Sequence, residues 1–252
     1  MKKLTVGSLF AGIGGFDLGL ERTGGFQVKW QVEIDPYCLK VLEKHWPHVK
    51  RYTDIKAVQW EAVEPVDLIC GGFPCQPVSV AGKRKGTSDE RWLWPEFVRC
   101  LGVLRPRYVL VENVPGLLTA NDGRAFADLL RDMAASGYDA EWDCIPAAAV
   151  GAPHRRDRLW LVAYAESSQD VSDTDYAAST RQRKDSRQVF IKPESTGFNG
   201  GSSEGWWTTE PNVGRVADGI PHRVDRLKCL GNAVVPQVVE WIGHQILNVH
   251  NS

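Results

Sequence analysis

Short apolar runs alternate with helically spaced apolar residues along most of the chain, and this rhythm predicts its secondary structure. The apolar runs predict buried strands at about 4–10, 27–34, 67–70 and 108–113, with later strands at 138–149 and 158–164. The helical spacing predicts helices near 15–22, 36–46, 92–104 and 122–136, and a closing helix over 238–247. Strands and helices that alternate in this way are typical of a doubly wound, mostly parallel α/β sheet.

The apolar rhythm stops after residue 165. Residues 166–205 are rich in Ser, Asp, Thr, Gln, Arg and Gly, and this composition predicts a long loop or an irregular segment. Trp206 and Trp207 extend that segment to about residue 214. We therefore divide the chain into residues 1–165, a small irregular region at 166–214, and a C-terminal segment at 215–252.

Composition and charge fit this organisation. The 252 residues, 43% of them hydrophobic, suit one α/β domain with a small appendage. No run of about 18 apolar residues predicts a membrane span, and the N-terminus leads directly into the first strand, so we expect a soluble, cytoplasmic protein. The six cysteines show neither a C-x-x-C pair nor zinc-ligand spacing, which predicts no structural metal and no disulfide framework. The net charge of −1 means that any attraction to nucleic acid is local.

One cysteine lies where a nucleophile is commonly presented. Cys75 follows the apolar run at 67–70 in the loop Gly-Gly-Phe-Pro-Cys-Gln-Pro, and the basic residues Lys83, Arg84 and Lys85 come soon after it. A thiol reacts as its thiolate, which an exposed and electropositive loop favours. A buried structural cysteine is the alternative that this segment alone leaves open.

A glycine turn follows the first predicted strand. Gly12, Gly14 and Gly15 allow a tight turn close to a ligand, and Glu33 ends the second strand about 20 residues later, where nucleotide-binding folds hold ribose hydroxyls. The spacing is G-x-G-G instead of G-x-G-x-x-G, and the turn has no Lys-Ser/Thr pair for phosphates. A nucleoside cofactor without phosphates therefore fits best.

A second carboxylate ends the most apolar strand. Glu112 follows the run Tyr-Val-Leu-Val and precedes a Pro-Gly turn. An acid at this end of a parallel strand lies at the rim where such sheets bind ligands, and partial burial keeps a carboxyl group protonated near neutral pH. Glu112 is thus a candidate general acid, with a helix-capping or ion-pairing role as the alternative.

With these segments in place, the chain resembles the DNA cytosine-5 methyltransferases that depend on S-adenosylmethionine. The matching segments occur in the family's order and span nearly the whole chain: FAGIGGFDLGL at 10–20, VEIDPYC at 32–38, TDI at 53–55, GGFPCQPVS at 71–79, ENV at 112–114, HRRDR at 154–158 and LGNAVVP at 230–236. The family's Q-x-R-x-R element is matched at Arg156 and Arg158. His154 replaces its glutamine, and this leaves His154 without an assigned role.

The resemblance implies a mechanism and a set of site residues. Cys75 would add to carbon 6 of cytosine, Glu112 would protonate ring nitrogen 3, and Arg158 with Arg156 would stabilise the developing charge. S-adenosyl-L-methionine would donate the methyl group, and no metal would be needed. The implied cofactor-binding residues are Phe10, Gly12, Gly14, Glu33, Ile34, Asp54, Pro74, Asn232 and Ala233.

The resemblance also implies partners and roles for the three segments. Residues 1–165 would form the catalytic and cofactor-binding domain, 166–214 a short target-recognition region or flexible loop, and 215–252 a segment that returns to the catalytic domain. The partner would be duplex DNA with its target cytosine flipped out of the stack. We expect a monomer in the cytoplasm of a bacterial cell or phage-infected host. The chain resembles compact phage or prophage members of the family. A cognate restriction endonuclease is a further candidate partner.

Three other functions share some of these features. A tRNA cytosine-5 methyltransferase would have the same catalytic residues, and activity on tRNA instead of duplex DNA would identify it. A catalytically silent protein that binds S-adenosylmethionine or DNA would not need both Cys75 and Glu112. An oxidoreductase on a related fold would need a diphosphate site, which the glycine turn does not offer.

Overall fold

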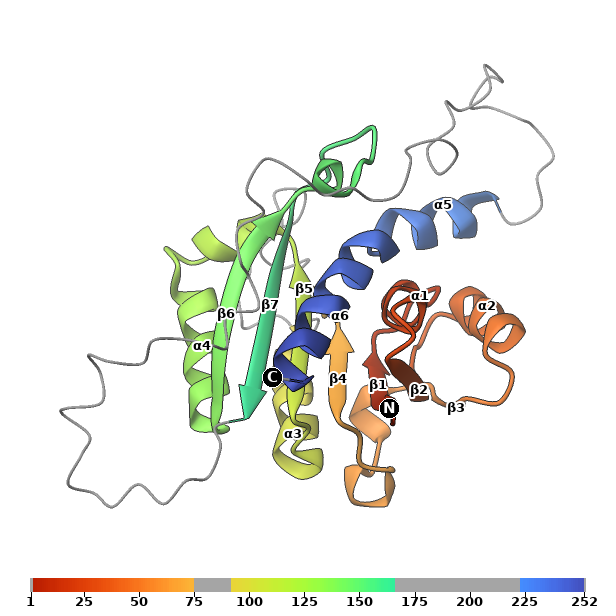
Figure 1. The fold of residues 1–252 in the computed structure, drawn as a ribbon, viewed down its shortest axis with the longest axis horizontal. Helices are drawn as coiled ribbons and strands as arrows, with labels where there is room; N and C mark the ends of the chain where they lie inside the picture. The colour runs from red at the N-terminus through yellow and green to blue at the C-terminus, as the bar shows by residue number, and fades with distance from the viewer. Residues whose placement is uncertain (1, 75–91, 166–222, 252) are drawn as a thin grey trace.

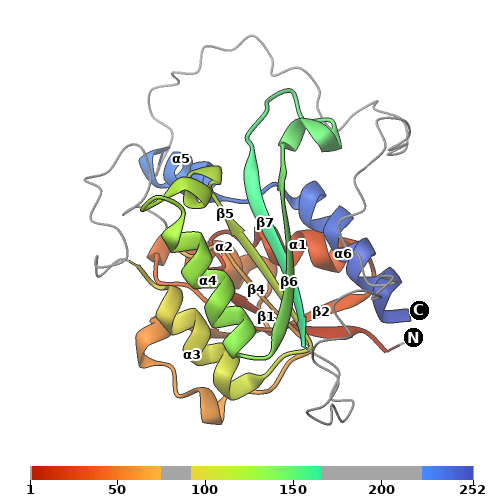
Figure 2. The ribbon, with the colours of Figure 1, turned by 90° about the vertical axis from the view of Figure 1, so that its left-hand side faces the viewer.

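The computed structural model describes residues 2–74, 92–165 and 223–251. The predicted nucleophile Cys75 and the predicted recognition region 166–214 both lie outside the described residues. The described part forms one seven-stranded sheet with helices on both faces (Figures 1 and 2). The predicted doubly wound, mostly parallel α/β fold is confirmed.

The sheet has the strand order β3-β2-β1-β4-β5-β7-β6. Its strands are β1 (Leu4–Leu9), β2 (Phe26–Val32), β3 (Lys50–Tyr52), β4 (Leu68–Gly71), β5 (Tyr108–Asn113), β6 (Tyr138–Ile145) and β7 (Arg158–Ala165). The strands β1 to β5 run parallel, whereas β7 is antiparallel to both of its neighbours. The direction in which successive strands are added to the sheet reverses between β1 and β4. At such a point the carboxyl ends of the parallel strands border a crevice.

Helices cover both faces of this sheet. They are α1 (Gly15–Arg22), α2 (Pro36–His45), α3 (Trp94–Leu104), α4 (Arg124–Ala135), α5 (Arg223–Asn232) and α6 (Pro236–Asn251). Figures 1 and 2 show α3 and α4 on one face, with α1 and α6 on the other. Helix α6 packs against α1, so the C-terminal segment ends beside the first helix.

The strand β5 shows why the central strands read as continuous apolar runs. Tyr108 and Leu110 point into the layer shared with α1 and α6, whereas Val109 and Val111 point into the layer shared with α3 and α4. All four side chains are buried. A strand covered on both faces needs apolar residues at every position, and period-two alternation is lost.

The structure also departs from the predicted elements in four places. Neither β3 nor α5 was predicted, because a three-residue edge strand and a mostly polar helix carry little apolar pattern. The strand expected over 138–149 ends at Ile145, directly before Pro146, which has no N–H for the sheet. The closing helix is longer than 238–247, since Pro236 is compatible with a first helical turn. None of the described helices is long and apolar enough to cross a membrane.

A buried carboxylate lies behind the glycine turn. Asp17 on α1 is fully buried and accepts hydrogen bonds from Ser8 Oγ at 3.1 Å and Gln31 Nε2 at 3.0 Å. Burial raises the pKa of Asp17 to about 6, against an ordinary value of 3.8. The folded state favours protonated Asp17, so protonation of this residue stabilises the fold. The stabilisation is fully present below pH 3.8 and is lost as the pH rises through 6.

We expect Asp17→Asn to remove this pH dependence. Relative to the unmutated protein, the variant should gain about 1–3 kcal/mol of unfolding free energy between pH 4 and pH 7.5. Urea unfolding across that range measures the difference. Glu43→Gln, at an exposed carboxylate on α2, is the control and should show no such gain. Equal pH profiles for Asp17→Asn and the unmutated protein would contradict the assignment.

Candidate active site

A pocket of about 930 Å³ lies at the carboxyl ends of β1, β2, β4 and β5. Its lining includes ten of the predicted site residues: Phe10, Gly12, Glu33, Ile34, Asp54, Pro74, Glu112, Arg158, Asn232 and Ala233. Gly14 and Arg156 are described but do not line the pocket. The structure thus brings together segments that are up to 223 residues apart in the sequence, from Phe10 to Ala233.

The glycine turn forms one wall of the pocket. Its backbone is left-handed at Phe10 (φ 51°), Gly12 (φ 56°) and Gly14 (φ 85°). A side chain at Gly12 would meet open space, so the backbone there is accessible to a ligand. Gly14 is buried, and a Cβ atom at this position would lie within 2.4 Å of the Trp46 ring. Gly14 therefore allows the turn to pack, and the contact with a ligand is left to Gly12.

The carboxylate of Glu33 organises the second wall. Its Oε2 accepts from Gly12 N at 2.7 Å, and its Oε1 accepts from Ile34 N at 2.9 Å and Asp35 N at 2.7 Å. Glu33 thereby connects the glycine turn after β1 to the end of β2. The adjacent Ile34 side chain is 70% exposed although it is large and apolar, and it faces the same pocket. An exposed apolar side chain beside a carboxylate suits a ligand with both a flat apolar part and hydroxyl groups.

The pocket wall continues into residues 54–58, which Arg99 holds in place. The sequence alone did not identify this arginine. Asp54 Oδ1 accepts from Lys56 N at 2.9 Å and so begins the short helix Ile55–Ala57. Arg99 on α3 donates to Ile55 O at 2.8 Å and to Val58 O at 3.0 Å. Because these carbonyl groups lie 41 and 44 residues away from Arg99 in the chain, no local pattern indicated this contact.

The acid at the end of β5 forms an ion pair with the predicted arginine of β7. Arg158 Nε lies 2.9 Å from Glu112 Oε1, and the two side chains are only 22% and 12% exposed. The antiparallel pairing of β5 with β7 explains this contact, because it places the start of β7 beside the end of β5. Burial raises the pKa of Glu112 to about 7, although Arg158 and Arg156 oppose the shift. A carboxyl group with this pKa can donate a proton near neutral pH.

Gly72 and Asn113 place this acid beside the segment that leads to Cys75. A Cβ atom at Gly72 would lie 2.7 Å from Glu112 Oε2, so a larger residue there would force this carboxylate to shift. Asn113 is buried and donates from Nδ2 to Phe73 O at 3.2 Å. Sequence reasoning assigned no role to either residue, although both belong to segments that it had singled out.

We expect Gly72→Ala to slow the methyl transfer that the sequence resemblance implies. The added methyl group would displace the Glu112 carboxylate from Arg158, and a misplaced catalytic group costs on the order of 10²-fold in rate. Affinity for the implied cofactor should change little, and calorimetry beside an assay of the implied reaction separates the two effects. Gly102→Ala is the control, since a Cβ atom there meets nothing within 4 Å. Full activity in Gly72→Ala would show that this close approach is not needed.

The predicted catalytic residue Arg156 contacts the C-terminal segment. Its Nη2 donates to Gly231 O and to Ala233 O, each at 2.7 Å. Its backbone is left-handed, with a φ of 39°. Arg156 therefore connects the segment before β7 to the segment that carries Asn232 and Ala233, while Arg158 faces the acid. The neighbouring His154 is exposed.

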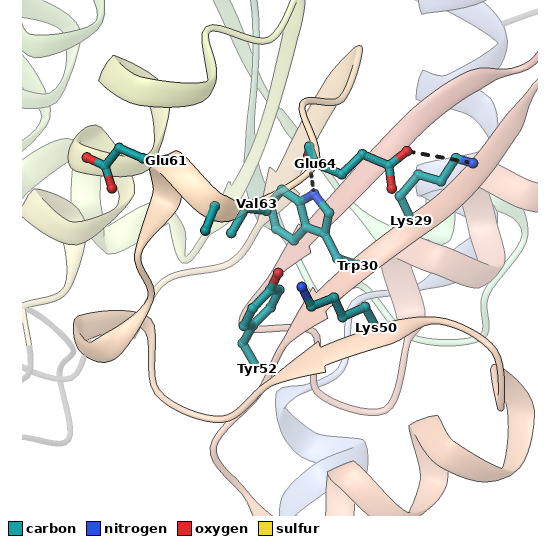
Figure 3. A pocket seen from close by; sticks show the side chains of 8 residues that line it. Lys29, Trp30, Lys50, Tyr52, Glu61, Val63 and Glu64 are labelled. Atoms are coloured by element: carbon teal, nitrogen blue, oxygen red, sulfur yellow. Dashed lines mark hydrogen bonds and ion pairs between the residues drawn. The ribbon is translucent and has the colours of Figure 1, made fainter.

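A second pocket, of about 380 Å³, lies beside the edge strand β3. Figure 3 shows Lys50 and Tyr52 on one side of it and Trp30, Val63 and Glu64 on the other. Trp30 Nε1 donates to Glu64 O at 2.9 Å, and this bond holds the loop before β4 against β2. None of the predicted site residues lines this pocket, so the candidate active site is the larger one.

Comparisons with known proteins agree with this geometry. The family model for C-5 cytosine-specific DNA methylase matches residues 4–210. Type II methyltransferase M.Bsp6I of Bacillus sp. strain RFL6 is 33% identical over 164 residues, which cover 64% of this chain and 52% of that protein. Type II methyltransferase M.HgiCII of Herpetosiphon aurantiacus is 32% identical over 189 residues, which cover 73% of this chain and 43% of that protein. The chain spans about half the length of the curated relatives it matches.

Solved structures of other proteins share this fold. A protein described as a DNA modification methyltransferase encoded within an E. coli prophage matches with a TM-score of 0.55 and 29% identity, over 68% of this chain and 49% of that one. DNMT2 of Spodoptera frugiperda has the same fold, with a TM-score of 0.54 and 22% identity over 68% and 53% of the two chains. From the family model, the relatives and the site geometry together, we conclude that the chain belongs to the C-5 cytosine-specific DNA methylase family.

Proposed function

We propose that the protein transfers a methyl group from S-adenosyl-L-methionine to carbon 5 of a flipped-out cytosine in duplex DNA, through a covalent adduct with Cys75. One observation carries the proposal: the Glu112–Arg158 pair lines the large pocket, beside the Gly72–Pro74 segment that leads to Cys75. A raised carboxyl pKa, a paired guanidinium and an adjacent thiol-bearing loop are what cytosine activation requires.

The pocket fits the proposed cofactor. Its volume of about 930 Å³ suits a nucleoside with an amino-acid tail, and the accessible backbone at Gly12 allows close approach. Glu33 would hold the ribose hydroxyls, Ile34 would contact the flat face of the adenine, and Asp54 would bind its edge. Asn232 and Ala233 would close the pocket from the C-terminal side. When bound, the cofactor supplies an electrophilic methyl group.

We assign each of these protein groups a role in the proposed reaction. Cys75 would add as a thiolate to carbon 6 of the cytosine, and Glu112 would donate its proton to ring nitrogen 3. Arg158 would stabilise the charge that develops on the adduct, and Arg156 would hold the C-terminal wall in place. The adduct makes carbon 5 nucleophilic, so that it accepts the methyl group. Loss of the carbon 5 proton then expels Cys75 as a thiolate, nitrogen 3 returns its proton to Glu112, and 5-methylcytosine is released.

The proposed substrate requires base flipping and local positive charge. A stacked cytosine cannot reach the acid at the end of β5, and flipping it costs a few kcal/mol that protein–DNA contacts offset. We propose that residues 166–214 contribute these contacts, together with Lys83, Arg84 and Lys85. A monomeric state, a cytoplasmic setting and a cognate restriction endonuclease stay predictions of the sequence.

A methyl-transfer assay tests the proposal. Purified protein is incubated with cofactor labelled in its methyl group and with either genomic duplex DNA or tRNA, and the nucleosides are separated after digestion. We expect label in 5-methylcytosine from duplex DNA. Label confined to tRNA, or found on adenine or on the cytosine amino group, would contradict the proposal.

Glu33 should control cofactor affinity without taking part in catalysis. We expect Glu33→Ala to weaken S-adenosyl-L-methionine binding by roughly 1–3 kcal/mol, because charge-assisted hydrogen bonds to the ribose are lost. Part of the loss would come from the turn itself, since Gly12 N would lose its acceptor. Calorimetry measures the affinity. Exposed Glu43 offers the control variant Glu43→Gln, and an unchanged affinity in Glu33→Ala would remove Glu33 from the cofactor site.

A further inference from the structure

Two buried thiols meet at the rim of the large pocket, where α2 approaches α5. Cys38 Sγ lies 3.0 Å from Cys229 Sγ, although 191 residues separate them in the sequence. Each residue is 5% exposed, and both line the pocket, so the pocket gives a small reagent a path to the sulfur atoms. Nothing in the proposed methyl transfer uses either thiol.

The two cysteines belong to opposite walls of the pocket. Cys38 follows Glu33, Ile34 and Asp35 by a few residues, while Cys229 directly precedes the segment that carries Asn232 and Ala233. In the reduced protein the same walls are joined by an ion pair between Lys228 Nζ and Asp35 Oδ2, at 2.8 Å. The Lys228 side chain is 62% exposed, so water and salt weaken this connection.

The geometry favours a thiol pair over a metal site. Asp35, Cys38 and Cys229 place their ligand atoms within 4.8 Å of one another. Two thiolates on one tetrahedral zinc ion, each about 2.3 Å from the metal, would lie about 3.8 Å apart. The observed 3.0 Å is much shorter, and Asp35 already accepts from Tyr37 N, Cys38 N and Lys228 Nζ. Forming a disulfide would need an approach of about 1 Å, to the bond length of about 2.05 Å.

We propose that Cys38 and Cys229 form a reversible disulfide that locks the two walls of the cofactor pocket together and slows cofactor exchange. Hydrogen peroxide serves as the oxidant: one thiol sulfur takes an oxygen atom to give a sulfenic acid and water. The second thiol sulfur attacks the sulfenic sulfur, forms the S–S bond and releases a second water. Two thiols are oxidised as one peroxide is reduced to two waters, and a dithiol reagent reverses the change.

Peptide mapping tests the disulfide itself. The full chain carrying Cys75→Ser is used, so that oxidation of the proposed nucleophile cannot contribute. After treatment with hydrogen peroxide and alkylation of the remaining thiols, we expect a cross-linked peptide that joins residues 38 and 229 and disappears with dithiothreitol. It should be absent from Cys38→Ser and from Cys229→Ser, and it should persist in Cys144→Ser, where the replaced thiol is exposed. A missing cross-link, or stoichiometric zinc bound through these cysteines in native mass spectrometry, would overturn the proposal.

Stopped-flow binding of S-adenosyl-L-methionine tests the lock, which rests on the proposed cofactor site. We expect oxidation to slow association and dissociation by on the order of tenfold or more, with recovery after dithiothreitol and no slowing in Cys38→Ser. Cross-linked protein with unchanged rates would refute the lock while leaving the proposed function intact. Failure of the reduced protein to bind the cofactor at all would refute the proposed function and the lock together.

Discussion

Cys75→Ser should abolish methyl transfer while it leaves cofactor affinity and folding nearly unchanged. A serine hydroxyl carries far less anionic character than a thiol near neutral pH, so addition to cytosine should slow by on the order of 10³-fold or more. Turnover on duplex DNA, cofactor calorimetry and urea unfolding measure the three properties.

The matched control for this variant is Cys144→Ser, which replaces an exposed thiol that does not line the pocket. It should retain full turnover, because Cys144 is not among the described residues that line the pocket. A Cys75→Ser protein that kept more than about a tenth of the original turnover would exclude Cys75 as the nucleophile.

Glu112→Gln should have the second largest effect on turnover. The amide can approach ring nitrogen 3 of cytosine but cannot donate a proton to it, and it loses the ion pair with Arg158. We expect turnover to fall by on the order of 10²- to 10³-fold, with little change in cofactor affinity. Calorimetry beside the turnover assay separates this role from that of Glu33.

The pH profile adds a specific signature of Glu112. Its pKa of about 7 lies above the ordinary 4.5, so the protonated acid predominates below pH 7 and is lost as the pH rises above it. The activity of the unmutated protein should therefore carry a limb that declines above about pH 7, and Glu112→Gln should lack that limb. A variant that kept the same declining limb would assign it to another group.

The core elements could be predicted because their sequence pattern is strong. Apolar runs at β1, β4 and β5 follow from burial on both faces of a parallel sheet, and Asp35 with Pro36 gives the start of α2. The acid at the end of β5 and the glycine turn after β1 were likewise predictable, since parallel strands place their carboxyl ends along one edge. These features all depend on local sequence.

The remaining site geometry depends on contacts between distant segments. The Glu112–Arg158 pair arises because β7 enters the sheet antiparallel to β5, and no residue pattern in β7 reveals its direction. Arg156 was expected to help Arg158 stabilise the developing charge, which stays a prediction. Its side chain binds the carbonyl groups of Gly231 and Ala233, which only the fold brings near. The thiol pair of Cys38 and Cys229 was likewise not predictable, because only the fold brings these two residues together.

Covalent trapping on duplex DNA tests the central claim most directly. A long duplex is made by polymerase with 5-fluorodeoxycytidine in place of deoxycytidine, so that every target sequence carries the analogue, and it is incubated with the protein and S-adenosyl-L-methionine. Fluorine at carbon 5 blocks the final elimination, so we expect a denaturation-resistant adduct that maps to Cys75 and is absent with ordinary cytosine or with Cys75→Ser. No adduct from protein that binds both cofactor and duplex, or an adduct on another residue, would contradict the proposed mechanism.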